Sequence, residues 1–302
     1  MIRSRKPLAN ARGSNDGVID AAPDPQDDSP VDASDSNQLA EYIRSWCHNR
    51  DDDAIYVESH LTRLVRTLEI TPAGSPQDRV LEMGAYMHIT PALKSKLGYG
   101  EVRGSYLGQR GRTDVREVTS SSGDHFRCDV DLFNAERDPY PYDDGEFATV
   151  LCCELIEHLY DDPMHLMSEV NRIVRPGGHF VLSTPNVCSY RAVAAILLNY
   201  HPGFFHQYVK PDDDGVVDPR HAREFAPRDV QHLFEAAGFE LVHLETGPYL
   251  ERRTAEYEWV KHVMQRYDLP EQWRGDAIFA VGRKTGQVRE RYPAALYVGG
   301  AA

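Results

Sequence analysis

The sequence predicts an α/β fold of three layers, in which a mostly parallel sheet of seven strands lies between helices. Three observations support this prediction. From Cys128 to Asn186 a strand, a helix and a second strand follow one another, which is the order of a β-α-β unit. Strand-like and helix-like segments alternate along most of residues 76–284. Two strands close this region, as is typical of doubly wound sheets.

Two amphipathic helices are expected before the sheet begins. Apolar residues recur at helical spacing from Asn37 to Asn49 and from Ala54 to Leu68. The turn-rich segment TPAGSPQD, Thr71 to Asp78, separates these helices from the first strand. Residues 37–75 are therefore expected to form a helical extension that packs on the sheet domain.

Seven segments have the length and apolar content of buried strands. They are RVLEMGA from Arg79, EVRGSYLG from Glu101, HFRCDVDLF from His125, FATVLCC from Phe147, HFVLSTP from His179, FELVHLETG from Phe239 and DAIFAVGRK from Asp276. The helices expected among them are Pro91 to Leu97, with Thr90 as cap, a helix starting at Asp162-Pro163, Val187 to Tyr200, Arg228 to Ala237, and one around Glu256 to Arg266.

Composition limits the class of partner. The 302-residue chain carries a formal net charge of −14, which argues against nucleic acid or an anionic membrane surface as partners. Residues 1–36 are rich in aspartate and poor in large apolar side chains, so we expect a disordered acidic tail. The five cysteines form no CxxC pair and are expected to be reduced. Neither a secretory signal nor a membrane-span segment is recognisable, which predicts a cytoplasmic protein.

A long polar segment, residues 200–226, follows the fifth strand and has neither a helical nor a strand period. Loops of this length in compact domains are usually functional or disordered. We expect this one to be a lid over the acceptor. Residues 285–302 are expected to form a C-terminal tail.

Four segments in this order resemble the class I S-adenosylmethionine-dependent methyltransferases. They are RVLEMGA, CDVDLFNAERDPYPYDDGEFATVLCCELIEHL, EVNRIVRPGGHFVLSTPN and HAREFAPRDVQHLFEAAGFELV. The similarity covers about 210 residues and is greatest to the small-molecule branch of that family, which carries patterns such as PFPDGSFD, EHL and LKPGG. It implies a Rossmann-like methyltransferase sheet with S-adenosyl-L-methionine as cofactor.

The resemblance also implies which residues bind the cofactor. The glycine-rich loop of the family lies after the first strand, an acid after the third strand binds the adenine amino group, and the segment after the fourth strand lines the methionine side. The residues at the matching positions are Glu82, Gly84, Ala85, Tyr86, Asp129 or Asp131, Glu154 and Leu155.

Two departures from the family pattern favour an alternative. Tyr86 and His88 occupy positions where the family usually has glycine, and the second strand, near Ser105-Tyr106-Leu107, lacks the acid that usually binds the ribose hydroxyls. Losing one charge-assisted hydrogen bond costs on the order of 1.5–3 kcal/mol. A methyltransferase-like binding or scaffold protein that has lost the cofactor is therefore the alternative to an enzyme.

Polar residues after the fourth strand and in the lid are candidates for the acceptor side. The candidate general bases are His158, His221 and His206, although His158 and the nearby glutamates could equally cap a helix start. The residues expected to contact the acceptor are Glu157, Asn186, His201, Phe205 and Tyr208. For a metal, His201, His206 and Asp213 are the candidate ligands, but such loops are more often solvated, so no metal is expected.

These observations predict an S-adenosylmethionine-dependent methyltransferase that acts on an oxygen of a polar small molecule, such as a saccharide or a specialised metabolite. Nitrogen and carbon are less favoured as acceptor atoms. A nucleotide-dependent oxidoreductase is disfavoured because the region after the first strand lacks G-x-G-x-x-G. A homodimer is compatible with the sequence.

Overall fold

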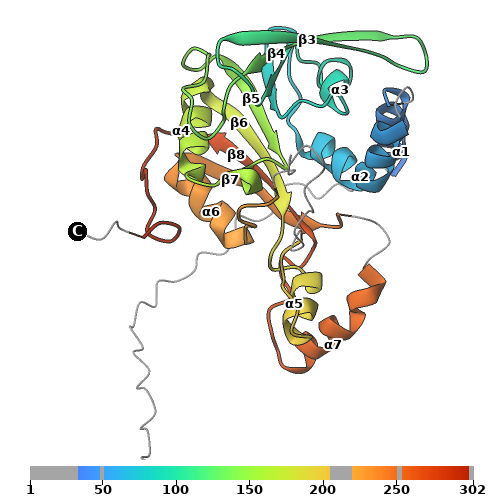
Figure 1. The fold of residues 1–302 in the computed structure, drawn as a ribbon, viewed down its shortest axis with the longest axis vertical. Coiled ribbons are helices and arrows are strands. Elements are labelled where there is room, and N and C mark those ends of the chain that lie inside the picture. The colour runs from blue at the N-terminus through green and yellow to red at the C-terminus, as the bar shows by residue number, and fades with distance from the viewer. Residues whose placement is uncertain (1–32, 48–50, 205–219, 250–253, 299–302) are drawn as a thin grey trace, which may run out of the picture. The chain divides into compact units, whose positions relative to one another are not determined.

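The computed structural model describes residues 33–47, 51–204, 220–249 and 254–298 (Figure 1). A single sheet with helices on both faces confirms the predicted α/β fold of three layers. The predicted acidic tail lies outside the described residues except for 33–36, which belong to the first helix. Residues 205–219, most of the predicted lid, also lie outside them.

The sheet has eight strands in the order β3-β4-β2-β1-β5-β6-β8-β7. The five neighbours from β4 to β6 run parallel, β3 is antiparallel to β4, and β8 is antiparallel to both β6 and β7. In chain order the strands are β1 Arg79–Met83, β2 Glu101–Tyr106, β3 Arg112–Thr119, β4 His125–Leu132, β5 Phe147–Cys153, β6 Val174–Pro185, β7 Phe239–Gly247 and β8 Ala277–Lys284. All seven predicted strands are present, and β3 is an additional one.

Strand β3 lies at the edge of the sheet and forms a hairpin with β4. Its sequence, RTDVREVT, contains only two aliphatic residues, and most of its side chains are exposed. The turn after it is closed by a hydrogen bond of 2.8 Å from Ser120 N to Asp124 O, and Gly123 adopts a φ of +90° there. Because neither face of β3 is apolar, the hydrophobic pattern used to find the other strands does not reveal it.

Helices connect the strands close to the predicted positions. They are α1 Ala33–Ser45, α2 Asp51–Ile70, α3 Thr90–Ser95, the 3₁₀ turn η1 Ile156–His158, α4 Pro163–Ile173, α5 Tyr190–Leu197, α6 Pro227–Ala236, the 3₁₀ turn η2 Thr254–Tyr257 and α7 Glu258–Arg266. The start of α4 is as predicted, since the Asp162 side chain accepts from Met164 N at 3.1 Å.

The starts of α3 and α5 differ from the prediction in ways that their N-terminal residues explain. Thr90 is the first residue of α3, and its N-cap is Ile89, which makes no side-chain capping bond. The prediction that Thr90 caps this helix was wrong, because Thr90 lies within the helix and its buried hydroxyl makes no hydrogen bond to the described residues. Helix α5 is shorter than predicted and starts after Ser189, whose hydroxyl accepts from Ala192 N at 3.2 Å.

Apolar side chains cover both faces of the central strands. Successive residues point to opposite faces, so Leu81 and Val150 pack with α4 and α6, whereas Val80 and Leu151 pack with α1, α2 and α3. Helices α5 and α7 pack on each other, apart from these layers, through Ala194, Val260 and Met264 (Figure 1). The N-terminal helices α1 and α2 thus contribute residues to the apolar core on one face of the sheet.

The predicted C-terminal tail is ordered against the domain up to residue 298. Tyr297 Oη donates to Asp162 Oδ1 at 2.6 Å, and Arg291 forms an ion pair with the same carboxylate. Tyr297 also packs on the core beside α4. The N-terminus of α4 is therefore stabilised by its N-cap residue Asp162 and by the contacts of Asp162 with Arg291 and Tyr297.

All five cysteines carry free thiols, three of them buried. In the part of the chain that the structure describes, no helix has the length and apolar character needed to cross a bilayer.

Candidate active site

The carboxyl ends of β1, β5 and β6 lie side by side. Met83 is paired with Cys152, and Cys153 with Ser183, so the loops that leave these strands begin at one edge of the sheet. In a parallel α/β sheet this edge is where ligands bind. The residues predicted for cofactor and acceptor from these loops therefore start from a common place.

The loop after β1 turns sharply. Gly84 adopts a φ of +68°, a backbone conformation that side chains disfavour, and the N–H groups of Gly84 and Ala85 both donate to Ser105 O, at 3.0 and 3.1 Å. Met87 also has a positive φ, of 69°. Leu155, from the loop after β5, packs beside Gly84. The two predicted cofactor loops are therefore in contact.

Glu82 is a buried carboxyl with an unused oxygen. Only 7% of the residue is exposed, and Oε2 has no hydrogen-bond partner among the described residues. Burial raises the pKa of Glu82 to about 7, although Thr90 and Arg116 oppose the shift. A buried acceptor of this kind suits a cationic donor, and the ammonium group of the methionine part of S-adenosylmethionine is one. This observation fits the predicted cofactor.

This unused carboxyl leads to a prediction on stability. In the unfolded chain Glu82 ionises near its ordinary pKa of 4.5, whereas in the fold it keeps its proton up to about pH 7. The folded state thus binds more protons between these values, and stability falls as the pH rises through this window. The ionisation cost should reach about 3 kcal/mol above pH 7, so Glu82→Gln should stabilise the ligand-free protein by about this amount at pH 8.5 but hardly at all at pH 4.5.

Urea unfolding of both proteins at the two pH values measures this difference. Glu235→Gln, at an exposed position of α6, is the matched control and should have the same effect at both. A Glu82→Gln effect that does not grow with pH would show that Glu82 is not held in its protonated form.

Tyr86 and His88, which replace glycines of the family pattern, build an aromatic stack. The His88 ring lies between Tyr86 and Tyr56, with ring centroids 6.0 and 5.1 Å away, and Tyr56 in turn stacks on His60 at 4.2 Å. Tyr86 is 56% exposed, and its hydroxyl lies 3.0 Å from that of Tyr106. The extra side chains therefore connect the loop after β1 to helix α2.

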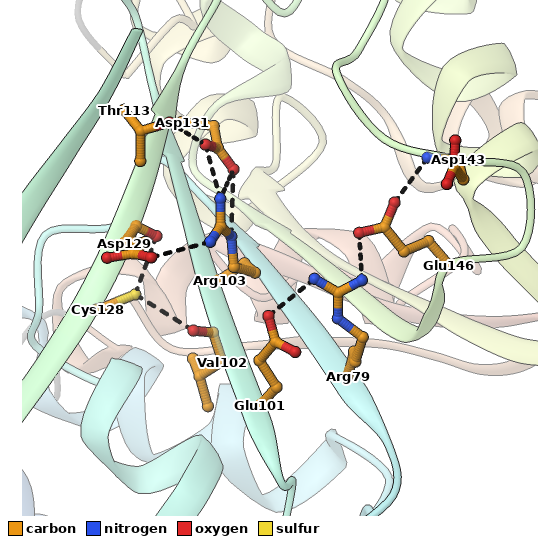
Figure 2. Close-up of polar contacts among 10 residues, drawn as sticks. All are labelled: Arg79, Glu101, Val102, Arg103, Thr113, Cys128, Asp129, Asp131, Asp143 and Glu146. Carbon is orange, nitrogen blue, oxygen red and sulfur yellow. Dashed lines mark hydrogen bonds and ion pairs between the residues drawn. The ribbon is translucent and has the colours of Figure 1, made fainter.

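The acids predicted for adenine are held by an arginine. Figure 2 shows Arg103 of β2 donating from Nη2 to both oxygens of Asp131, at 2.8 and 2.7 Å, and from Nη1 to Asp129 at 3.1 Å. Thr113 of β3 adds a hydrogen bond of 2.7 Å to Asp131. Both acids lie within β4, whereas the resemblance placed such an acid after the strand. An adenine amino group would have to compete with Arg103, so this assignment stays a prediction.

Glu154 follows β5 in a strained conformation, with a φ of 53°. Its Oε1 accepts from Ser183 Oγ at 2.9 Å and lies 3.7 Å from Nη1 of Arg63, a residue of α2 with a fully buried side chain. Arg63 also donates to the Tyr56 hydroxyl at 2.9 Å. Non-glycine residues in this region of backbone space concentrate at functional sites.

Glu157, His158 and His221 come together beside Glu154. One ligand-type atom of each lies within 4.8 Å of the others, and the rings of His158 and His221 are 5.0 Å apart. Glu157 is fully buried, and its Oε2 accepts from Thr184 Oγ1 at 2.9 Å. Burial, and then the neighbouring Glu154, raise the pKa of Glu157 well above its ordinary value. Two of the three predicted bases thus meet at the edge where the ligand is expected.

The remaining predicted site residues separate into three groups. Asn186 is fully buried, and its amide donates to Trp273 O at 2.9 Å and to Gly275 O at 2.7 Å, which is a structural role. His201 is exposed, and its Nδ1 accepts from Gly203 N at 3.0 Å. The predictions that fall outside the described residues are those for Phe205, His206, Tyr208 and Asp213.

Three further residues of the site were not among the predictions: Arg63, Arg116 and Glu224. Arg63 lies at helical spacing with Tyr56 and Thr67, a pattern that could have placed it on the inner face of its helix. Arg116 of β3 donates to Ala85 O and lies 4.5 Å from the centre of the Tyr106 ring. Glu224 forms a hydrogen bond with His221. The only feature of the sequence that could have indicated this contact is that Glu224 follows His221 by three residues.

Comparisons with known proteins agree with this geometry. A family model described as "Methyltransferase domain" matches residues 54–244. The "Probable S-adenosylmethionine-dependent methyltransferase" of Mycolicibacterium smegmatis is 30% identical over 112 residues, which are 37% of this chain and 36% of that protein.

Two further relatives are named for different acceptors. The sarcosine/dimethylglycine N-methyltransferase of Halorhodospira halochloris is 27% identical over 56% of this chain and 63% of its own length. The ubiquinone biosynthesis O-methyltransferase of Burkholderia thailandensis is 27% identical over 59% of this chain and 71% of its own. The matched region is thus less than two thirds of the length of the first two relatives.

Proposed function

Because the chain belongs to the class I S-adenosylmethionine-dependent methyltransferases, we propose that it methylates an oxygen atom of a polar small molecule. A saccharide or a specialised metabolite is the proposed class of acceptor. When bound, S-adenosylmethionine supplies a methyl group on a positively charged sulfur. The proposed cofactor residues are Glu82, Gly84, Ala85, Tyr86, Glu154 and Leu155, at the carboxyl edge of the sheet.

The single observation that carries this proposal is the cluster of Glu157, His158 and His221. An activated methyl group needs mainly alignment and a pocket that excludes water, but a hydroxyl acceptor must also lose its proton. The two imidazoles are the groups in position to assist that loss. An amine that is already neutral would need no such group, so the cluster favours oxygen over nitrogen.

The names of the relatives do not decide between oxygen and nitrogen as the acceptor atom. One is named for an amine, sarcosine or dimethylglycine, and another for an O-methylation in ubiquinone biosynthesis. The family therefore includes both kinds of acceptor atom. The choice of oxygen here rests on the imidazoles of this chain rather than on either name.

Calorimetry with S-adenosylhomocysteine tests whether the cofactor site is intact. We expect one molecule to bind per chain, since the buried Glu82 oxygen and the turn at Gly84 are in place. Gly84→Val should weaken binding at least about tenfold, because a β-branched residue disfavours a φ of +68°.

The control is Gly111→Ala, which also changes a glycine of positive φ, at +85°, but with no atom near its Cβ position. It should leave the affinity unchanged. If no binding is detected at millimolar S-adenosylhomocysteine, the enzyme proposal fails, and a methyltransferase-like binding protein becomes the better description.

A further inference from the structure

We propose that Glu157, His158 and His221 form a binding site for one divalent ion of a first-row transition metal. These residues come from two segments that the fold ties together: η1 after β5 and the residues just before α6. The backbone N–H groups of Ala222 and Arg223 both donate to Glu157 O, at 2.7 and 3.2 Å. The two segments that carry these side chains are therefore joined by main-chain hydrogen bonds.

The Glu157 carboxylate is positioned as a ligand. Thr184 fixes Oε2, while Oε1 has no hydrogen-bond partner and lies 4.0 Å from His221 Nε2. No arginine or lysine of the described residues forms an ion pair with this carboxylate, although its side chain is only 1% exposed. An unsatisfied buried oxygen is costly, and a cation between the carboxylate and the imidazoles would remove that cost.

The His221 ring is oriented by a second carboxylate, which contacts the nitrogen on the side away from Glu157. Its Nδ1 lies 3.1 Å from Glu224 Oε1, which also accepts from Phe204 N. Donation from Nδ1 to Glu224 leaves the lone pair on Nε2, the nitrogen that faces Glu157. A histidine that binds a metal through one nitrogen and a carboxylate through the other is the usual arrangement in metalloproteins.

The donor set indicates the class of metal. Two imidazole nitrogens and one carboxylate oxygen suit Zn²⁺, Fe²⁺ or Co²⁺ better than Ca²⁺ or Mg²⁺, which prefer oxygen. Three protein ligands leave positions for an exogenous group, as in catalytic rather than structural sites. From the sequence, no metal was expected at His201, His206 and Asp213 of the lid. The site proposed here consists of other residues.

The role of the ion rests on the proposed function. An acceptor hydroxyl bound to the ion would lose its proton to solvent at a lower pH than a free hydroxyl. Its oxygen would then form a bond to the methyl carbon while the bond from that carbon to sulfur breaks. The products are the methyl ether and neutral S-adenosylhomocysteine, so charge and atoms balance. In this role the imidazoles act through the ion rather than as bases.

Metal titration of the protein after dialysis against a chelator tests the site. We expect Zn²⁺ and Co²⁺ to bind at one ion per chain in calorimetry, with bound Co²⁺ giving a visible absorption band. Glu157→Gln, which keeps the shape of the side chain, and His221→Ala should each lower the affinity at least about a hundredfold. Glu224→Gln should lower it by about 10–100-fold, because His221 loses its orienting carboxylate.

His232→Ala, which removes an exposed histidine of α6, is the control and should leave the affinity unchanged. Thermal unfolding shows whether each variant is folded, and Zn²⁺ should raise the unfolding temperature of the wild type but not of Glu157→Gln. Less than one ion per wild-type chain, or equal affinity in Glu157→Gln, would overturn the site.

The two proposals can fail separately. Methylation by chelator-treated protein that binds no metal would refute the metal site and leave the proposed function standing. Stoichiometric metal binding by a protein that does not bind S-adenosylhomocysteine would refute the proposed function and leave the metal site standing.

Discussion

Replacing His158 with alanine is expected to lower turnover by about 10²–10⁴-fold, the usual range for loss of a group that assists proton removal. Affinity for S-adenosylhomocysteine should change by less than about threefold, well under one kcal/mol. The reason is the division of the site: His158 lies with Glu157 and His221, whereas the proposed cofactor contacts come from the loop after β1 and from Glu154. The same result is expected whether His158 takes the proton itself or binds a metal that acidifies the acceptor.

Single-turnover rates with a methylated product detected by mass spectrometry measure the first quantity, and calorimetry the second. His232→Ala is again the control, since it removes an imidazole from an exposed surface of the same domain. Unchanged turnover in His158→Ala would remove His158 from the catalytic site. Equal loss of turnover and of cofactor affinity would instead assign it to the cofactor pocket.

Replacing Arg63 with methionine is expected to destabilise the fold by about 3–5 kcal/mol, the cost of leaving a buried charge without its partner. The Arg63 side chain is 2% exposed and that of Glu154 is 11% exposed, with Nη1 and Oε1 3.7 Å apart. The guanidinium also lies 5.2 Å from the centre of the Tyr249 ring. Methionine fills the space but supplies neither the charge nor the hydrogen bond to Tyr56.

Chemical denaturation of a double-mutant cycle measures this effect. Adding Glu154→Gln to Arg63→Met should recover a large part of the loss, because the unpaired charge is then gone. Arg283→Met breaks an exposed ion pair with Glu240 and should cost less than about 1 kcal/mol. A loss below 1 kcal/mol in Arg63→Met would show that Glu154 is not balanced by this residue.

The sheet was predictable from sequence because its central strands are buried on both faces. Segments such as FATVLCC and HFVLSTP are mostly apolar and almost completely buried, and the polar residues that follow them mark the edge of the site. The position of His158 at this edge was predictable for the same reason, since it follows the first of these strands within six residues.

Side-chain contacts that depend on strand register or on tertiary packing were not predictable from the sequence. Arg103 is opposite Asp129 across β2 and β4, and only this register shows that an arginine occupies the acids assigned to adenine. Arg63 reaches Glu154 from a helix almost a hundred residues earlier in the chain, and helical spacing alone does not say which loop a helix covers. His221 could be named as a candidate, but its pairing with Glu157 is a tertiary contact.

Strand β3 has a consequence for the behaviour of the protein in concentrated solution. An edge strand exposes unpaired backbone groups that can recruit a strand from another molecule. The edge formed by β3 carries charged side chains along its length, at Arg112, Asp114, Arg116 and Glu117. Such charges disfavour edge-to-edge association. Strand β3, which carries Arg116 to the site, therefore also disfavours aggregation through this edge of the sheet.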